Sequence, residues 1–153
     1  MKRSMMLALA LFSLAMWSFG QSADAEKQSI IRVIEDAYMN GIGNVGDPAA
    51  IKNGFHPEFN LLGLSDGKLW KRPIAEWIAM VQKQKAEGGY PPKEKVFFKY
   101  PMIDVVGSAA IVKIHYYRGA QHVYTDFLSM YKFKDGWKIV GKIFYQHPQP
   151  AGD

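Results

Sequence analysis

The sequence contains no cysteine among its 153 residues. Disulfide bonds, thiolate metal ligands and thiol nucleophiles are therefore excluded, and stability must come from packing and hydrogen bonds. Also absent are a glycine-rich phosphate loop, a serine nucleophile elbow and a dinucleotide-binding fingerprint. No motif thus indicates nucleotide binding or serine-based hydrolysis, and we predict no cofactor.

Histidine is scarce, and its spacing does not favour a metal centre. Zinc ligands recur at short paired spacings on one helix or in a knuckle. The histidines here lack such pairing; they are His56, His115, His122 and His147. We therefore predict no metal site.

The net charge of +5 is a mild excess. Part of it comes from a locally basic stretch, whose lysines are Lys83, Lys85, Lys93, Lys95 and Lys99. No recognisable nucleic-acid module surrounds these lysines. We interpret them as a solvated rim that aids solubility and predict no nucleic-acid partner.

A long apolar run occurs only at the N-terminus. Lys2 and Arg3 precede the apolar segment Met5–Phe19, and small residues follow it up to Ala25. This order is typical of a secretory signal peptide. A membrane anchor is the alternative, but the run falls short of the ~20 residues that span a bilayer. We predict an exported protein, periplasmic or secreted and free of the membrane after cleavage, with a signal peptide at 1–25, one domain at 26–148 and a short polar tail at 149–153.

Three helices are predicted in the first part of the domain. Apolar residues recur at three- and four-residue spacing from Glu26 to Met39, and Asn40-Gly41 and Gly43-Asn44 are expected to end this helix. Asp47-Pro48 reads as an N-cap and first helical residue of a short second helix, which Asn53-Gly54 closes. Pro73 begins a third, amphipathic helix.

The remaining segments are typical of β-strands. Phe59–Leu64 and Lys68–Lys71 form a predicted hairpin around Ser65-Asp66-Gly67. Four segments rich in β-branched and aromatic residues then predict an antiparallel meander: Lys95–Ile103, Ala109–Tyr117, His122–Phe133 and Trp137–Tyr145, with Asp104–Gly107 as the first turn. The expected fold class is α+β, with three helices packed on a curved antiparallel sheet.

Several short motifs resemble one superfamily in their order and spacing. They are Ile34–Tyr38 with Gly41, Gly46-Asp47, Phe55-His56-Pro57, Tyr124–Leu128, and Asp135–Ile139 with Lys142. The chain thus resembles the nuclear transport factor 2-like superfamily, which has a cone-shaped, cystatin-like fold and includes ketosteroid isomerase, scytalone dehydratase and SnoaL-like cyclases. The local matches resemble its lumazine-binding-like, SnoaL-like branch. The resemblance implies a deep pocket at the wide end of the cone.

We accordingly expect a small-molecule-binding domain with an aromatic-lined conical pocket, whose ligand is planar or aromatic. The predicted ligand-binding residues are Tyr38, Trp77, Phe98, Tyr100, Tyr116, Tyr124 and Asp126. For Tyr38, a core position with the hydroxyl bonded to backbone is an equal alternative.

Asp126 is the residue with two open interpretations. A carboxylate among apolar strand residues needs solvent, a pocket or a cation. A three-residue turn before β-strand 137–145 puts Asp126 opposite Phe144 and diagonal to Lys142, which favours an ion pair. A two-residue turn shifts the register by one.

The alternative function is an enzyme of the isomerase, cyclase or dehydratase type. Its catalytic candidates are Asp126, Tyr38 and His115. Ketosteroid isomerase divides its work between an aspartate base and an oxyanion hole of tyrosine and a protonated aspartate. The segment Phe59–Leu64 offers only Asn60 where a first-strand base is expected, which argues against an isomerase.

The meander is apolar on both faces. Alternation places Phe97, Tyr117, Phe127 and Tyr131 opposite Phe98, Tyr116 and Tyr124. Helices can cover one face only, so we expect a homodimer through the other. A structural or immunity-like role, with that face against another protein, is a third possibility.

Overall fold

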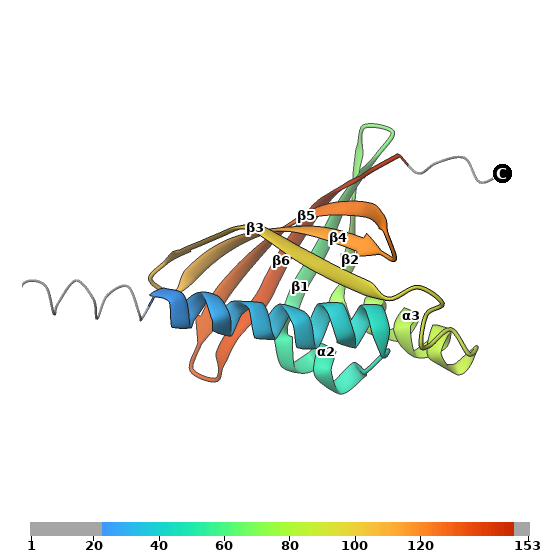
Figure 1. Ribbon diagram of the computed structural model, residues 1–153, viewed down its shortest axis with the longest axis horizontal. Helices are drawn as coiled ribbons and strands as arrows, with labels where there is room; N and C mark the ends of the chain where they lie inside the picture. Colours follow the sequence, from blue (N-terminus) through green and yellow to red (C-terminus); the bar gives the residue numbers. More distant parts are fainter. Residues whose placement is uncertain (1–22, 149–153) are drawn as a thin grey trace, which may run out of the picture.

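The computed structural model describes residues 23–148, so most of the predicted signal peptide and the tail at 149–153 lie outside the described part. An α-helix over 23–34 continues directly into η1 (Glu35–Asn44). The other elements are α2 (Pro48–Gly54), β1 (Phe55–Ser65), β2 (Lys68–Pro73), α3 (Ile74–Ala86), β3 (Val96–Val106), β4 (Ala109–Arg118), β5 (Gln121–Phe133) and β6 (Gly136–Gln146) (Figure 1). Among residues 23–148, no helix combines the length and apolarity needed to cross a bilayer.

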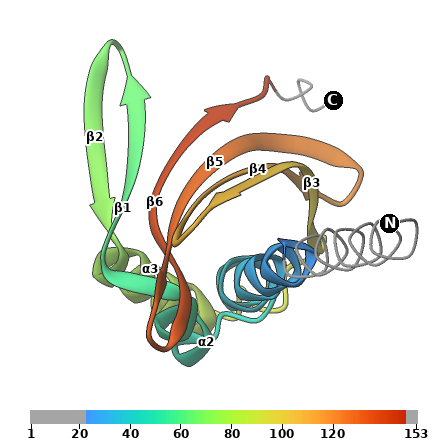
Figure 2. The same ribbon diagram turned by 90° about the vertical axis from the view of Figure 1, so that its left-hand side faces the viewer.

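The six strands form one curved sheet in the order β2-β1-β6-β5-β4-β3, and the helices lie on its concave side (Figure 2). The predicted α+β class and the segregation of helices from the sheet are confirmed. The expectation of a purely antiparallel sheet is wrong at one place, since β1 runs parallel to β6. Because of this pairing, the hairpin of β1 and β2 lies beside β6 at the edge of the meander, where it forms one wall of the cone.

The first helix passes the first of its two predicted stops and ends at the second. Asn40-Gly41 does not stop it, because the chain continues as a π-helix over Glu35–Asn44, which ends at Gly43-Asn44. Gly41 and Gly43 allow close packing instead: a Cβ on Gly41 would lie 3.0 Å from Ile51 Cγ1, and one on Gly43 would lie 3.1 Å from Val96 Cβ. The π-helical stretch carries Tyr38, in keeping with the frequent use of such turns at functional sites.

The predicted caps and the first hairpin are confirmed. The Asp47 carboxylate accepts a 2.9 Å hydrogen bond from the Ala49 amide, and Pro48 is the first residue of α2. Asp66 and Gly67 adopt positive φ of 51° and 71°, as a tight two-residue hairpin turn requires. The turn predicted over Asp104–Gly107 is shorter in the structure, because Asp104 to Val106 stay paired in β3.

Both registers considered for Asp126 occur, one on each side of a bulge. Phe133 pairs with Gly136 around a two-residue turn, but the pairing shifts between Ser129 and Met130, opposite the extra residue Val140. Beyond this bulge, Asp126 pairs with Phe144 and Leu128 pairs with Lys142. Asp126 and Lys142 are therefore diagonal neighbours on one face, the arrangement expected for an ion pair.

The core fills one end of the cone. On β4, β5 and β6 the fully buried residues lie toward one end of the sheet: Val112 and Ile114, Leu128 and Met130, and Ile139. They pack in one core cluster with Ile30 and Ile34 of the first helix. At the other end of the same strands the side chains are larger, aromatic or charged, and an open cavity lies there.

Candidate functional site

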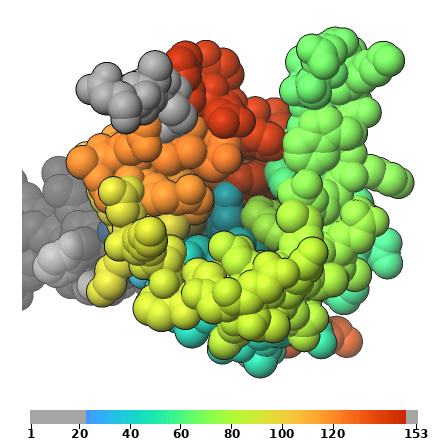
Figure 3. Space-filling view, turned by 90° about the vertical axis from the view of Figure 1, so that its right-hand side faces the viewer, coloured from blue at the N-terminus to red at the C-terminus, as the bar shows by residue number. Residues whose placement is uncertain are grey.

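The cavity has a volume of about 850 Å³ and opens between the β1–β2 hairpin, α3 and the ends of β4 to β6 (Figure 3). Atoms of the first helix are visible in its depth (Figure 3). Its aromatic lining consists of Tyr38, Trp70, Trp77, Tyr90, Tyr116, Tyr124 and Phe144. Pockets of this size that combine aromatic walls with a few polar groups are typical of small-molecule sites.

A buried cluster of three polar side chains, Tyr38, Asp126 and Lys142, closes the floor of the cavity; we call it the floor triad. The Lys142 ammonium lies 2.7 Å from Asp126 Oδ2 and donates to the Tyr38 hydroxyl at 2.5 Å. Tyr38 in turn donates to Asp126 Oδ2 at 2.8 Å. Tyr38 and Lys142 line the cavity, whereas Asp126 is fully buried behind them. The predicted ion pair of Asp126 with Lys142 is confirmed.

Aromatic rings surround the Lys142 ammonium. It lies 4.8 Å from the ring centre of Tyr38, 5.2 Å from Phe144, 5.7 Å from Trp77 and 5.8 Å from Tyr124. These distances permit cation–π attraction, which strengthens where water is excluded. Burial lowers the pKa of Lys142, and the Asp126 carboxylate opposes that shift.

The proton on the Tyr38 hydroxyl is firmly held. Burial raises the pKa of Tyr38 well above its usual range, and the Asp126 carboxylate raises it further. Tyr38 is therefore a neutral donor to Asp126 near neutral pH. An ammonium has three donors, and two of those on Lys142 are engaged by Asp126 and Tyr38. The third remains available to a molecule in the cavity.

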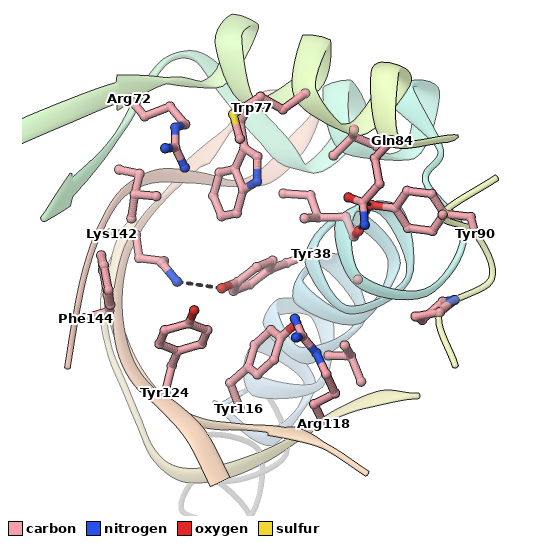
Figure 4. A pocket seen from close by; sticks show the side chains of 18 of the residues that line it. Tyr38, Arg72, Trp77, Gln84, Tyr90, Tyr116, Arg118, Tyr124, Lys142 and Phe144 are labelled. Carbon is pink, nitrogen blue, oxygen red and sulfur yellow. Dashed lines mark hydrogen bonds between the residues drawn. The ribbon is translucent and has the colours of Figure 1, made fainter. Parts of the chain in front are cut away.

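Four of the seven predicted ligand-binding residues line the cavity: Tyr38, Trp77, Tyr116 and Tyr124 (Figure 4). Phe98 does not, because it packs beneath them, with its ring centre 5.0 Å from that of Tyr38. Tyr100 is also outside the lining, and burial raises its pKa. Asp126 is separated from the cavity by the other two members of the floor triad. Alternation along a strand predicts the face of a residue, not its depth.

His115 does not reach the floor triad. On β4, Ile114 is the residue paired with Asp126, and His115 pairs with Thr125 on the opposite face. There its ring lies 4.7 Å from that of His122. The enzyme hypothesis therefore loses His115 as a partner of Asp126. Among the described residues, no group of three or more histidine, aspartate or glutamate side chains is placed to ligate a metal ion.

Several residues of the cavity lining were not predicted from the sequence. Trp70 comes from the predicted hairpin, and Arg72 lies in β2 one residue beyond its predicted end; the position of this hairpin beside β6 depends on the unexpected parallel pairing. Trp70 needs Gly63, since a Cβ at Gly63 would lie 2.1 Å from the indole Cζ2. Lys142 was expected only as a structural partner. No alternation in residue type marks Trp70 and Arg72, since Leu69 is apolar and Lys71 is charged.

We predict strong coupling between Asp126 and Lys142. Because both are buried, Asp126→Asn or Lys142→Met alone should cost roughly 3 to 5 kcal/mol of unfolding free energy, since each strands the other charge. The double variant should lose clearly less than the sum of the two. Denaturant unfolding of the four proteins measures the cycle, and a coupling energy near zero would contradict a paired charge.

Comparison with known proteins shows which family this chain resembles. Residues 25–145 match the family described as "Putative lumazine-binding". The aldolase FrzH of Cladobotryum sp. is 30% identical over 105 residues, covering 68% of this chain and 79% of the aldolase. An NTF2-like protein of unknown function from Shewanella baltica is 26% identical, with a TM-score of 0.66, over 82% of this chain and 96% of its own. An NTF2-like protein with a cystatin-like fold from Novosphingobium aromaticivorans reaches the same TM-score at 14% identity, over 88% of this chain and 90% of its own. The chain belongs to the lumazine-binding-like family of the nuclear transport factor 2-like superfamily.

Proposed function

We propose that this protein binds a small planar or aromatic molecule in the cavity of its cone. The observation that supports this most directly is the combination of an open cavity of about 850 Å³ with an aromatic lining and a polar floor. The family description points to the same class of activity.

The arrangement of the aromatic side chains favours a flat ligand. Trp77 on α3 and Tyr124 on β5 project into the cavity from opposite sides, and Lys142 and Tyr38 lie between them at the floor (Figure 4). A planar ring inserted here would contact aromatic faces and meet a hydrogen-bond donor at its inner edge. Burial of aromatic surface supplies affinity, and the few polar groups orient the ligand.

Removing the indole of Trp77 should weaken binding. Against a panel of planar heteroaromatics that includes lumazine, measured by fluorescence polarisation or calorimetry, Trp77→Ala should lose about tenfold or more, because buried aromatic anchors carry roughly 2 kcal/mol or more. The control is Leu69→Ser, on the same hairpin as Trp70 but 70% exposed and outside the cavity lining. Absence of saturable binding across the panel, or an equal loss in both variants, would contradict the proposal.

A second candidate is an enzyme that acts on a carbonyl compound. The observation favouring it is the 30% identity to an aldolase. In such a reaction, the free donor of Lys142 would stabilise a developing oxyanion. Asp126 would be the group of the floor triad that accepts a proton. Asp126 Oδ1 has no hydrogen-bond partner among the described residues, so it has capacity to accept a proton. Mass spectrometry of the ligand recovered from the binding experiment separates the two functions, since a binding protein returns its ligand unchanged.

Export remains our proposal for the cellular location. A signal peptide cleaved after Ala25 would make Glu26 the first residue of the mature chain. The Glu26 carboxylate accepts a 2.7 Å hydrogen bond from the Trp137 indole and pairs with Lys132. Glu26 is thus a well-anchored start for the domain. The intact mass of the protein from its native host should correspond to a chain beginning at Glu26, and a retained Met1 would refute export by this route.

We also propose a homodimer through the convex sheet face. Phe97 and Tyr117 stack there at 4.8 Å, and Phe127, Tyr131 and Ile143 are 37%, 52% and 54% exposed. Burying such side chains favours association by about 1.5 to 3 kcal/mol each.

Light scattering should therefore give the mass of a dimer, and Phe127→Lys should shift it toward the monomer. Lys113 already lies over the Phe127 ring at 5.7 Å, so the new charge would meet a like charge in each copy. A wild-type monomer at high concentration would contradict the dimer.

A further inference from the structure

The cationic groups around the cavity indicate the charge of the ligand. The inference drawn from them rests on the function proposed above. We propose that the ligand is an anion whose carboxylate, or another planar oxyanion, docks on the guanidinium of Arg72 beside Lys142. Its aromatic body would then lie against Trp77 and Tyr124.

Strand register places Arg72 and Lys142 on one row of the sheet. Arg72 on β2 pairs with Leu61 on β1, and Leu61 pairs with Lys142 on β6. Paired residues point to the same face, and neighbouring strands are about 4.8 Å apart. The two backbones therefore lie roughly 10 Å from each other, and both long side chains project into the cavity (Figure 4). One small ligand can contact both.

The two cations differ in how far their charge is already compensated. Lys142 is paired with the buried Asp126. No ion pair among the described residues involves Arg72; its guanidinium lies over the Trp70 ring, 5.4 Å from the ring centre. Arg72 is only half-buried, so its charge is tolerated without a partner. The planar fork of arginine donors is therefore open toward the cavity.

Most of the charged side chains in the cavity lining are cationic. Arg72, Lys93, Arg118 and Lys142 are the cations of the lining, and Glu94 is its one carboxylate. Glu94 is on the loop before β3 and close to Gly119, since a Cβ there would lie 2.9 Å from Glu94 Oε2. Glu94 therefore lies beside Arg118. Neither residue belongs to β2, the strand that carries Arg72. The half of the cavity near Arg72 stays positive.

The geometry favours a planar oxyanion over a phosphate. Arginine binds a carboxylate through two parallel hydrogen bonds, which orient a flat group in the plane of the guanidinium. The Trp70 ring lies on one side of the same guanidinium, 5.4 Å from it, and limits approach from that side. A phosphate would usually be bound by several converging donors. In this part of the cavity Arg72 is the cation without a counter-charge among the described residues, whereas Lys142 is already paired with Asp126.

The test compares three probes that share one aromatic body: naphthoate, the neutral naphthamide and naphthyl phosphate. Titration calorimetry or ligand-observed NMR on the purified protein gives their affinities. Naphthoate should bind the wild type at least about tenfold more tightly than naphthamide, as expected for charge-assisted hydrogen bonds. Arg72→Met should abolish this preference, because it should weaken naphthoate binding far more than naphthamide binding. Raising the salt concentration should weaken naphthoate binding alone.

Lys71→Met is the matched control. It removes the same charge from the adjacent position of β2, which is exposed and outside the cavity lining, so the preference for naphthoate should persist. Equal binding of naphthoate and naphthamide would overturn this inference and leave the proposed function standing. Tightest binding of naphthyl phosphate would replace the planar oxyanion by a tetrahedral one and overturn the assignment. Failure of all three probes to bind would count against the proposed function itself.

Discussion

The contact between Lys142 and Asp126 is the constraint on which the rest of this structure depends. A lysine side chain exposed by only 5% cannot stay charged without a close counter-charge, and Asp126 supplies it at 2.7 Å. Tyr38 bridges the two groups with its hydroxyl. Because the three side chains come from η1, β5 and β6, movement of β5 or β6 would strand a charge, and movement of η1 would remove the hydroxyl that bridges the pair. The floor triad therefore ties the first helix to the sheet and also forms the polar floor of the cavity.

Two departures from regular geometry bring the floor triad together. The bulge opposite Ser129 and Met130 shifts β6 by one residue, which turns Lys142 toward Asp126. Without it, the two-residue turn at the hairpin would place Lys142 on the convex face. The π-helical segment Glu35–Asn44 carries Tyr38 inward and lets Gly41 and Gly43 approach their neighbours closely. Irregular backbone occurs here at the same place as the candidate site.

The charges of the cavity fall into two groups with different roles. The Lys142 charge is compensated inside the protein, so its main contribution to a ligand is one directed hydrogen bond. The Arg72 charge is not compensated, and under our proposal it would select for an anion. A ligand held at both points would have a fixed orientation, with its flat body against the rings of Trp77 and Tyr124. The same orientation would serve binding or, in the second candidate function, chemistry at a carbonyl group.

Local periodicity determined much of this fold. Three- and four-residue spacing marked the first and third helices, cap residues marked the second, and alternation marked the two apolar faces of the meander, because these patterns depend on neighbours in sequence. The two possible lengths of the turn before Trp137 left Asp126 two registers. Tertiary structure alone decided the rest: the parallel pairing of β1 with β6, the bulge that selects the register of Asp126, and the depth that puts Tyr116 in the cavity but Phe98 beneath it. Each of these depends on contacts between segments far apart in the chain, whose energies arise only when the sheet curves and the helices close over it.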